Sequence, residues 1–318
     1  MKCLGRGHIF AMNRSTRDEI RICHFSDLHL APKRSVVPWK LLGKRALGYA
    51  NLMLNRGRTH KEEHLVALLR KVTEEDADLV VVTGDFTSLS LGFEFQHIDA
   101  LFKAHGLSPQ RTVVIPGNHD RYTFLTDTFD AFEKGMADWM PAAFQRKAGY
   151  PIVRELGPVL FMALDTAVWR NPVRAAGAVS DDQLDRLKAA LDGNQGRRWP
   201  VIALHHPPVY RGLEKLRHYR TGLDGYERLI AALEDRPATV IHGHLHESSR
   251  CRVGALDIIG VPSASNNTGD PHTQLAYYVY TFAAAGLTLA EAVRLWPDRA
   301  PPEAQVERYE LPQEIGSP

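Results

Sequence analysis

The chain has 318 residues, 44% of them hydrophobic, and its 39 lysines and arginines nearly balance its 37 aspartates and glutamates. This composition is typical of a globular protein with a large core, and it excludes a disordered chain or one that needs disulfides to fold. The net charge of +2 argues against nucleic acid as a general partner, and three widely spaced cysteines without a CxxC motif argue against a Cys-based zinc site.

Hydrophobic periodicity predicts alternating strands and helices over the first two thirds of the chain. Strands are predicted at residues 20–25, 79–83, 112–115, 152–155, 159–164, 201–204 and 239–242, and helices at residues 60–75, 92–104, 126–139, 180–191 and 224–233. The last third is mostly strand, at residues 250–254, 256–261, 275–282 and 286–294. This order predicts an α/β (α+β) fold in which helices flank two packed mixed sheets.

Without an internal repeat or a low-complexity linker, one domain is expected over residues 19–295. It carries an insertion at residues 30–60, a flexible tail at 1–18, and a Pro- and Glu-rich tail at 296–318 that drapes over the surface. The first residues lack the apolar stretch of a secretory signal, and the sequence has no apolar run of 18 residues. With few cysteines, this predicts a cytoplasmic protein.

Five predicted strands end in polar side chains that are competent to bind metal. The clusters are Ser26-Asp27-Leu28-His29, Gly84-Asp85, Gly117-Asn118-His119-Asp120, His205-His206-Pro207-Pro208 and His242-Gly243-His244-Leu245-His246. Ligands of open α/β sheets bind beyond the carboxyl ends of strands, so we expect one convergent site. Asp27 and His29 are two residues apart, and an extended segment would point both the same way, as it would His244 and His246.

The convergent set contains seven potential ligands: Asp27, His29, Asp85, Asn118, His205, His244 and His246. Seven is too many for one tetrahedral zinc, but suffices for two divalent ions if one carboxylate bridges them. Mixed carboxylate, imidazole and amide donors favour Mn, Fe or Zn over Ca.

Taken singly, each cluster could also be a capped strand end or a core histidine. The metal interpretation depends on the presence of all five clusters, in order and each after a strand. His24 and His242 lie within strands and are predicted to be structural. The remaining histidines are expected at the surface: His60, His64, His97, His105, His218 and His272.

The ordered blocks DLH, GD, GNHD, HHPP and GHLH, spread over residues 20–265, resemble those of the calcineurin-like metallophosphoesterase superfamily. The resemblance implies a four-layer β-sandwich of two mixed sheets flanked by helices. It also implies that Asp27, His29 and His246 hold one metal, that Asn118, His205 and His244 hold the other, and that Asp85 bridges them.

Two neighbouring divalent ions would clamp a phosphate and supply hydroxide for in-line attack. The resemblance places His119 near the leaving group, where a protonated imidazole would donate to the departing oxygen. Asp120 would orient His119 or a metal ligand. Asn118 and His119 are expected to contact substrate, and His206 either contacts the phosphate or packs beneath the site.

Sequence differences from known subfamilies reduce the number of reactions that the resemblance allows. Phe86-Thr87-Ser88 follows Gly84-Asp85 where Ser/Thr protein phosphatases have DRG, and Ser88 stands where purple acid phosphatases place a ligating tyrosine. One bacterial type of UDP-diacylglucosamine hydrolase carries GNRD rather than a histidine at position 119. The HHPP block with His119 resembles cyclic-nucleotide and glycerophosphodiester phosphodiesterases. We therefore predict a phosphodiesterase, with a binding scaffold on the same fold as the non-enzyme alternative.

The insertion is strongly basic, with no acidic residue between Leu28 and Lys61. Its cations are Lys33, Arg34, Lys40, Lys44, Arg45, Arg56, Arg58 and Lys61, and its apolar residues recur at helical spacing at Trp39, Leu42, Ala46, Tyr49 and Met53. A basic amphipathic helix suits a peripheral membrane contact through residues 33–61 or an amphiphilic phosphate substrate, or it packs on the body as an ordinary helix. The segment also resembles a GNHD-bearing type of UDP-2,3-diacylglucosamine pyrophosphatase, which gives a lipid-linked substrate as the alternative.

Overall fold

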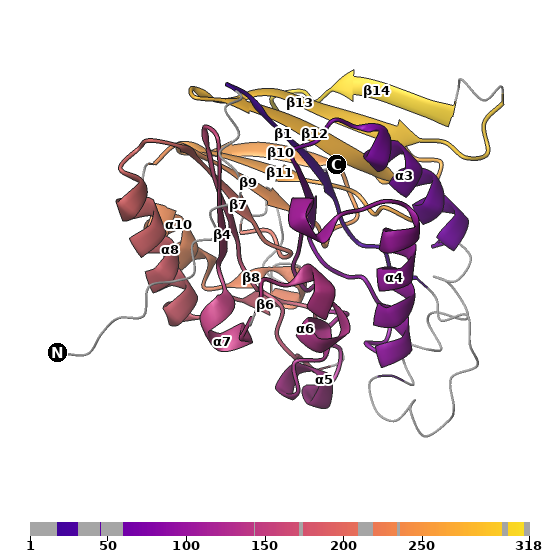
Figure 1. Ribbon diagram of the computed structural model, residues 1–318, viewed down its shortest axis with the longest axis horizontal. Helices are drawn as coiled ribbons and strands as arrows, with labels where there is room; N and C mark the ends of the chain where they lie inside the picture. Colours follow the sequence, from indigo (N-terminus) through magenta and orange to yellow (C-terminus); the bar gives the residue numbers. More distant parts are fainter. Residues whose placement is uncertain are drawn as a thin grey trace.

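Two six-stranded sheets form the centre of the protein, as shown by a computed structural model that describes residues 18–30, 45, 60–142, 144–171, 174–208, 219–233, 236–300 and 305–314 (Figure 1). The first sheet has the order β14-β13-β12-β1-β2-β3. Its strands are β1 (Ile20–Phe25), β2 (Leu79–Val82), β3 (Thr112–Val114), β12 (Ala276–Ala283), β13 (Gly286–Leu295) and β14 (Val306–Glu310). β1, β2 and β3 are parallel, and β12 to β14 extend the sheet antiparallel from β1.

The second sheet has the order β10-β11-β9-β7-β5-β4. Its strands are β4 (Ile152–Leu156), β5 (Val159–Ala163), β7 (Trp199–Ala203), β9 (Ala238–His242), β10 (Ser249–Val253) and β11 (Leu256–Gly260). The four inner strands are parallel, whereas the edge strands β4 and β10 are antiparallel to their neighbours. Both sheets are therefore mixed, as the sequence predicts.

Alternation along each strand separates two kinds of core. In β1, Ile20 and Ile22 face the second sheet, and Cys23 and Phe25 face the opposite way. Helices cover the outer faces: α3 (Glu62–Glu74) and α4 (Gly92–Ala104) on the first sheet, and α8 (Asp181–Asn194) and α10 (Tyr226–Leu233) on the second (Figure 1). Side chains that alternate between these two environments must be apolar on both faces, which explains the continuous hydrophobic runs. The predicted four-layer sandwich is confirmed.

Residues 126–139 do not form the single helix that periodicity predicts. They are divided among α5 (Phe124–Thr128), α6 (Ala131–Gly135) and the 3₁₀ turn η4 (Ala137–Trp139). Asp130 lies between α5 and α6 with φ of 52°, a left-handed conformation that a continuous helix cannot contain.

The C-terminal region adds a strand that the sequence does not reveal. β14 pairs with β13, so the first sheet continues beyond residue 295, and Arg308 contacts Glu291 at 3.0 Å across the pair. The strand is largely exposed and rich in charge, which makes it resemble a surface tail. A two-strand ladder, β6 (Gly177–Ala178) with β8 (Leu223–Asp224), also takes the start of the helix predicted at 224–233.

The predicted amphipathic helix of the insertion lies outside the described residues, except for Arg45 and the flanking Leu30 and His60. The predicted N-terminal tail and His218 also lie outside them, apart from residue 18. Among the helices of the described ranges, none combines the length and the apolarity needed to cross a bilayer.

Candidate metal centre

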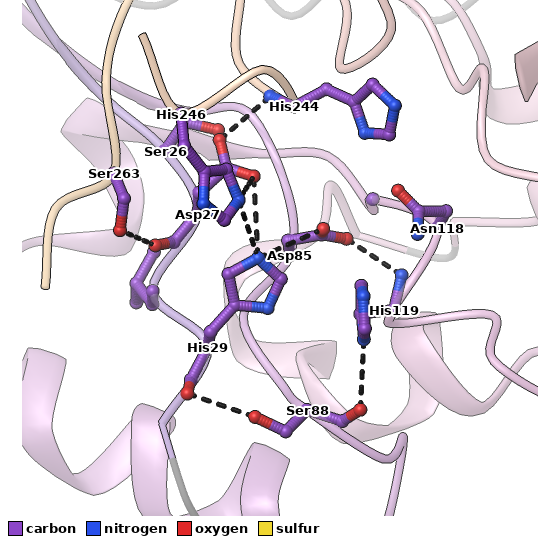
Figure 2. Close-up of polar contacts among 12 residues, drawn as sticks. Ser26, Asp27, His29, Asp85, Ser88, Asn118, His119, His244, His246 and Ser263 are labelled. Atoms are coloured by element: carbon purple, nitrogen blue, oxygen red, sulfur yellow. Dashed lines mark hydrogen bonds and ion pairs between the residues drawn. The ribbon is translucent and has the colours of Figure 1, made fainter. Parts of the chain in front are cut away.

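The loops that follow β1, β2, β3, β7 and β9 meet at one site, where Figure 2 shows side chains of Asp27, Asp85, Asn118 and His244 close together. Each of these strands is parallel to at least one other of the group within its sheet, so their carboxyl ends emerge on the same side. The structure brings together all seven predicted ligands, which come from segments more than 200 residues apart in the chain.

Four of these residues form a first donor cluster: Asp27, His29, Asp85 and His246. Nε2 of His29 lies 2.9 Å from Nε2 of His246 and 3.3 Å from Oδ2 of Asp85. Nε2 of His246 lies 3.1 Å from Oδ1 of Asp27. The four side chains thus direct their ligand atoms toward one point.

A second donor cluster contains Asn118, His205 and His244. Nε2 of His205 lies 3.3 Å from Oδ1 of Asn118 and 3.2 Å from Nδ1 of His244. The same nitrogen lies 3.5 Å from Oδ2 of Asp85. One oxygen of Asp85 is therefore close to a ring nitrogen of each cluster, which places this carboxylate between them.

The backbone at five of the seven ligands is left-handed rather than extended. The φ angles are 57° at Asp27, 43° at His29, 52° at Asp85, 73° at His244 and 58° at His246. The expectation that Asp27 and His29 share a side because their segment is extended is therefore wrong. Cross-loop bonds hold the turn, since the amide of Asp27 donates to Gly84 and that of His29 to Asp85, both at 3.0 Å. Strained residues of this kind concentrate at functional sites.

Two glycines are required by close approach to the ligands. A side chain at Gly117 would overlap the Asp85 carboxylate, and one at Gly243 would overlap Ser26 and the Asp27 carboxylate. The backbone of both loops therefore lies against the acidic ligands, which only glycine permits.

Neighbouring histidines keep the buried carboxylates ionised. Burial favours the neutral acid, but the positive charge that His246 can carry holds the pKa of Asp27 well below its usual range. Burial likewise opposes ionisation of Asp85, and His205 with its neighbours holds that pKa well below the usual range. Burial lowers the pKa of His205, but the Asp85 carboxylate outweighs it and raises the value to about 9. Burial lowers the pKa of His244 to about 3.

The donor set fits divalent metal ions. Ligands at roughly 2.1 Å from one ion lie about 3 Å from each other, and three facing pairs of the first cluster lie 2.9 to 3.3 Å apart, with a fourth at 3.7 Å. Nδ1 of His205 donates to the carbonyl of Thr83 at 2.6 Å, a bond that directs Nε2 into the site as in metal-binding histidines. Among the described residues, Oδ1 of Asp27 receives no hydrogen bond although it is buried.

His119 lies beside the two clusters, with its amide donating to Oδ1 of Asp85 at 2.8 Å. Its Nδ1 donates to the carbonyl of Ser88 at 3.0 Å, because a carbonyl can only accept (Figure 2). The ring stacks on Tyr122 with centroids 5.0 Å apart and meets His29 edge to face at 4.7 Å. These contacts fix the ring plane and the tautomer.

Asp120 is predicted to orient His119 or a metal ligand, and its contacts favour the second of these two roles. Its buried carboxylate accepts from the amides of Gly117 at 2.9 Å, Thr87 at 3.0 Å and Phe86 at 3.2 Å. Burial and the nearby Asp85 raise its pKa to about 7. Asp120 therefore ties two ligand-bearing loops together, and the carbonyl of Ser88 orients His119 instead.

His206 packs beneath the site. It is completely buried, with Nδ1 2.9 Å from the hydroxyl of Thr166 and Nε2 donating to the carbonyl of Ala175 at 3.1 Å. Its distance from His205 and His244 would suit a metal ligand. We nevertheless favour the packing role, because both ring nitrogens are already hydrogen-bonded within the protein.

Two histidines predicted at the surface are buried: His60 is 4% exposed and His64 3%. Nδ1 of His60 lies 2.7 Å from the hydroxyl of Ser265, and its ring lies 5.2 Å from that of His29. Their four-residue spacing at a helix start was the available signal for a shared buried face. His24 is structural as predicted, bonded to Thr83 at 2.8 Å and Tyr280 at 3.2 Å.

Comparisons with known proteins agree with this geometry. The sequence model of the calcineurin-like phosphoesterase family matches residues 20–248. A probable cyclic nucleotide phosphodiesterase of Synechococcus sp. is 25% identical over 207 residues, covering 64% of this chain and 72% of the relative. The 3',5'-cyclic adenosine monophosphate phosphodiesterase CpdA of Pseudomonas aeruginosa is 27% identical over 209 residues, covering 61% of this chain and 66% of the relative.

Solved structures share the fold at low identity. The purple acid phosphatase PPD1 of yellow lupin seeds superimposes with a TM-score of 0.58 at 13% identity, over 92% of this chain and 53% of that one. A dimetal phosphatase of Danio rerio gives a TM-score of 0.52 at 15% identity, over 86% of this chain and 94% of that one. This chain thus spans about half the length of the plant phosphatase.

Proposed function

Since the chain belongs to the calcineurin-like phosphoesterase family and is therefore a metal-dependent phosphoester hydrolase, we propose that it cleaves phosphodiesters at the two donor clusters. The observation that carries the proposal is the position of Asp85, whose Oδ2 lies 3.3 Å from Nε2 of His29 and 3.5 Å from Nε2 of His205. A carboxylate shared by two clusters is the arrangement that a pair of ions requires.

The distances between ligand atoms suggest which residues would hold each ion. The first ion would be held by Asp27, His29, His246 and Asp85, and the second by Asn118, His205, His244 and Asp85. When bound, divalent ions such as Mn, Fe or Zn supply Lewis-acid chemistry, neutralising phosphate charge and making water nucleophilic near neutral pH.

The chain's own groups would handle the substrate and the leaving group. The Asn118 amide lies at the edge of the second cluster, 7% exposed, where it can donate to a phosphate oxygen. His119, held through Nδ1 by Ser88, would give its Nε2 proton to the leaving oxygen, which a diester with an alkoxide leaving group needs. Two relatives named as cyclic nucleotide phosphodiesterases support a diester over a monoester.

A substrate panel tests the proposal. We expect the Mn²⁺-loaded protein to cleave bis-p-nitrophenyl phosphate and cyclic or glycerol diesters faster than monoesters, and to lose activity with a chelator. Asp182→Ala, at an exposed position, serves as the unaffected control. Cleavage of monoesters alone would reject the diester assignment, and a metal-loaded protein that cleaves neither class would leave the binding scaffold as the better explanation.

An amphiphilic substrate such as a lipid-linked diphosphate is the second candidate. Three side chains of α5 and the segment after it, which follow His119 by 5 to 10 residues in the chain, are exposed, with Phe124 at 61%, Leu125 at 62% and Phe129 at 60%. Trp169, 42% exposed, contacts Phe124. Contiguous exposed apolar side chains of this kind mark binding surfaces. The same surface, with the basic segment 33–61, would suit peripheral membrane contact.

A pair of substrates separates this candidate from a soluble diester. If an amphiphilic diphosphate is the substrate, Phe124→Ala with Phe129→Ala should raise KM for it about 30-fold or more and leave turnover of bis-p-nitrophenyl phosphate unchanged, since burial of each ring is worth roughly 1–2 kcal/mol. Equal KM values before and after the substitutions would remove the apolar surface from substrate binding.

A further inference from the structure

The loop at residues 88–91, hereafter the 88–91 loop, lies behind the site and contacts several of its residues. The carbonyl of Ser88 accepts from Nδ1 of His119, and the hydroxyl of Ser88 donates to the carbonyl of His29 at 3.0 Å. The hydroxyl of Ser90 donates to the carbonyl of Asp120 at 2.6 Å. The position of this loop therefore determines where the His119 ring points.

Three of the four amides of the 88–91 loop are held by one buried carboxylate, and the amide of Ser90 donates to the hydroxyl of Thr87 at 3.2 Å. Glu94, in the first turn of α4 and 4% exposed, accepts from the amides of Ser88 at 3.1 Å, Leu89 at 3.3 Å and Leu91 at 2.8 Å. This leaves the loop's carbonyls to be satisfied from another direction.

Arg45 supplies that second hold. Its Nε donates to the carbonyl of Leu89 and its Nη2 to the carbonyl of Ser90, both at 3.0 Å. Ser90 has a φ of 56°, a conformation that costs a non-glycine residue roughly 1–2 kcal/mol. The planar guanidinium fork matches two successive carbonyls, so it stabilises the loop in this strained form.

Arg45 comes from a segment that is distant in the chain from the loop it contacts. It lies in the insertion, between the ligand His29 and helix α3, and 45 residues before Ser90 in the chain. A bond network of two steps leads from it to the leaving-group histidine: Arg45 to the 88–91 loop, and Ser88 to His119.

We propose that Arg45 is a positioning residue of the hydrolytic reaction. By clamping the carbonyls of Leu89 and Ser90, it holds the Ser88 carbonyl against Nδ1 of His119 and so aims Nε2 at the leaving oxygen. In the step it serves, the water oxygen forms a new bond to phosphorus and releases a proton to solvent. The bond from phosphorus to the leaving oxygen breaks, that oxygen takes the bonding pair and the Nε2 proton, and His119 then regains a proton from solvent. The inference rests on the proposed function, because it assigns Arg45 a part in leaving-group protonation.

Leaving-group dependence tests the proposal. p-Nitrophenolate departs without a proton, whereas an alkoxide needs one. We expect Arg45→Gln to lower kcat about tenfold or more on an alkyl phosphodiester and less than about twofold on bis-p-nitrophenyl phosphate, with KM unchanged, because general acid catalysis is worth about 10²–10⁴. Arg45→Lys should recover part of the loss, and Arg70→Gln, at an exposed position of α3, should match the wild type.

A double-mutant cycle shows whether the effect passes through His119. If it does, Arg45→Gln has no further effect in a His119→Ala background. Equal losses on both substrates, or multiplying effects in the double variant, would overturn the proposal. If Arg45→Gln does not fold, Arg45→Lys carries the same comparison, since one ammonium cannot bridge two carbonyls as the fork does.

A structural readout keeps this inference separate from the proposed function. In ¹⁵N-histidine spectra, the His119 ring resonances are identified by their loss in His119→Ala, and Arg45→Gln should shift them while leaving metal content per chain unchanged. Unshifted resonances would refute the positioning role even in a protein without measurable turnover. A wild-type protein that cleaves no phosphoester would refute the proposed function instead.

Discussion

Two buried polar clusters of the protein differ in how their charged and polar groups are paired. In the first, the metal centre, ring nitrogens of His29 and His246 face each other at 2.9 Å. In the second, hereafter the arginine network, Arg121 contacts Glu133 at 2.5 Å and Asp165 at 2.8 Å. Arg146 adds a contact to Asp165 at 3.2 Å and to other carboxylates of the network.

The difference separates a structural cluster from a functional one. In the arginine network each cation meets carboxylates, so the cluster is stable without any further partner. In the metal centre, like donors converge, and two imidazole nitrogens can share at most one hydrogen between them. Only a cation placed among the donors satisfies all of them, which points to a bound metal. Substitutions should therefore impair metal binding and turnover in one cluster and folding in the other.

The largest expected effect is that of Asp85→Asn. Loss of the shared carboxylate would weaken the binding of both proposed ions. Because such ions contribute several kcal/mol to transition-state stabilisation, kcat/KM should fall by about 10³-fold or more. Asn118→Ala should act in the same direction through the second cluster. Metal content measured by elemental analysis should fall with the rate.

Stability of the metal-free protein provides the contrast for this prediction. Asn keeps the acceptor for the His119 amide, so unfolding in urea with a chelator present should change by only about 1 kcal/mol. An Asp85→Asn protein that retains two ions and full rate would show that Asp85 is not shared by them.

The second effect is on folding. Arg121→Met leaves Glu133 and Asp165 buried without their main cation, and should reduce the free energy of unfolding by about 3–5 kcal/mol. Arg70→Met, at an exposed position, should change it by less than about 0.5 kcal/mol. Metal content per folded molecule should stay near the wild-type value. A loss of metal without loss of stability would reverse the roles assigned to the two clusters.

The sequence predicts the parts of the fold and site that depend on local patterns. Residues 20–25 form β1 as expected, because an apolar run buried on both faces has a distinct composition. The ligand set follows from polar residues placed after parallel strands. The broken helix at 126–139 and strand β14 escape such reasoning: the first depends on one left-handed residue, Asp130, and the second on an exposed edge whose pairing is long-range.

Contacts made by backbone atoms or distant segments are also invisible in the sequence. The carbonyl of Ser88 holds His119, and a carbonyl carries no residue-type signature. The left-handed turn at Asp27 is held by a bond from its amide to the carbonyl of Gly84. The neighbouring hydroxyl of Ser26 donates to the carbonyl of Thr83, which is 57 residues away in the chain. His60 is buried by its contact with Ser265, which local periodicity cannot reveal.

Glu94 resembles neither the arginine network nor the metal centre. Its buried carboxylate accepts hydrogen bonds from backbone amides and has no direct ion-pair partner among the described residues. Burial raises its pKa from 4.5 to about 7, although the amides and Arg45 oppose the shift. Between these values the folded state binds a proton that the unfolded state does not, so the stability contributed by Glu94 is greatest below pH 4.5 and is lost as pH rises through about 7.

Glu94→Gln should remove this pH dependence. The wild type should lose up to about 3 kcal/mol of unfolding free energy between about pH 4.5 and 8 from this group, measured by urea titration. The Gln variant should show a flatter profile over the same interval. In Arg45→Gln the decline should extend to higher pH, since the guanidinium no longer lowers the Glu94 pKa. Parallel profiles in the wild type and Glu94→Gln would contradict the assignment.

The smallest expected effect is that of substitutions at His206. This residue tests whether hydrogen-bond satisfaction separates structural from functional histidines. Its ring touches the metal centre, with centroids 4.8 Å from His205 and 4.6 Å from His244, but both of its ring nitrogens are hydrogen-bonded within the protein. His206→Gln should therefore lower the free energy of unfolding by about 1–2 kcal/mol through lost buried hydrogen bonds, and leave metal content and KM close to wild type. Thr166→Val is the matched variant, because it removes the partner of Nδ1 without touching the ring. A rise in KM or loss of one ion in His206→Gln, but not in Thr166→Val, would mean that hydrogen-bond satisfaction fails to separate structural from functional histidines here.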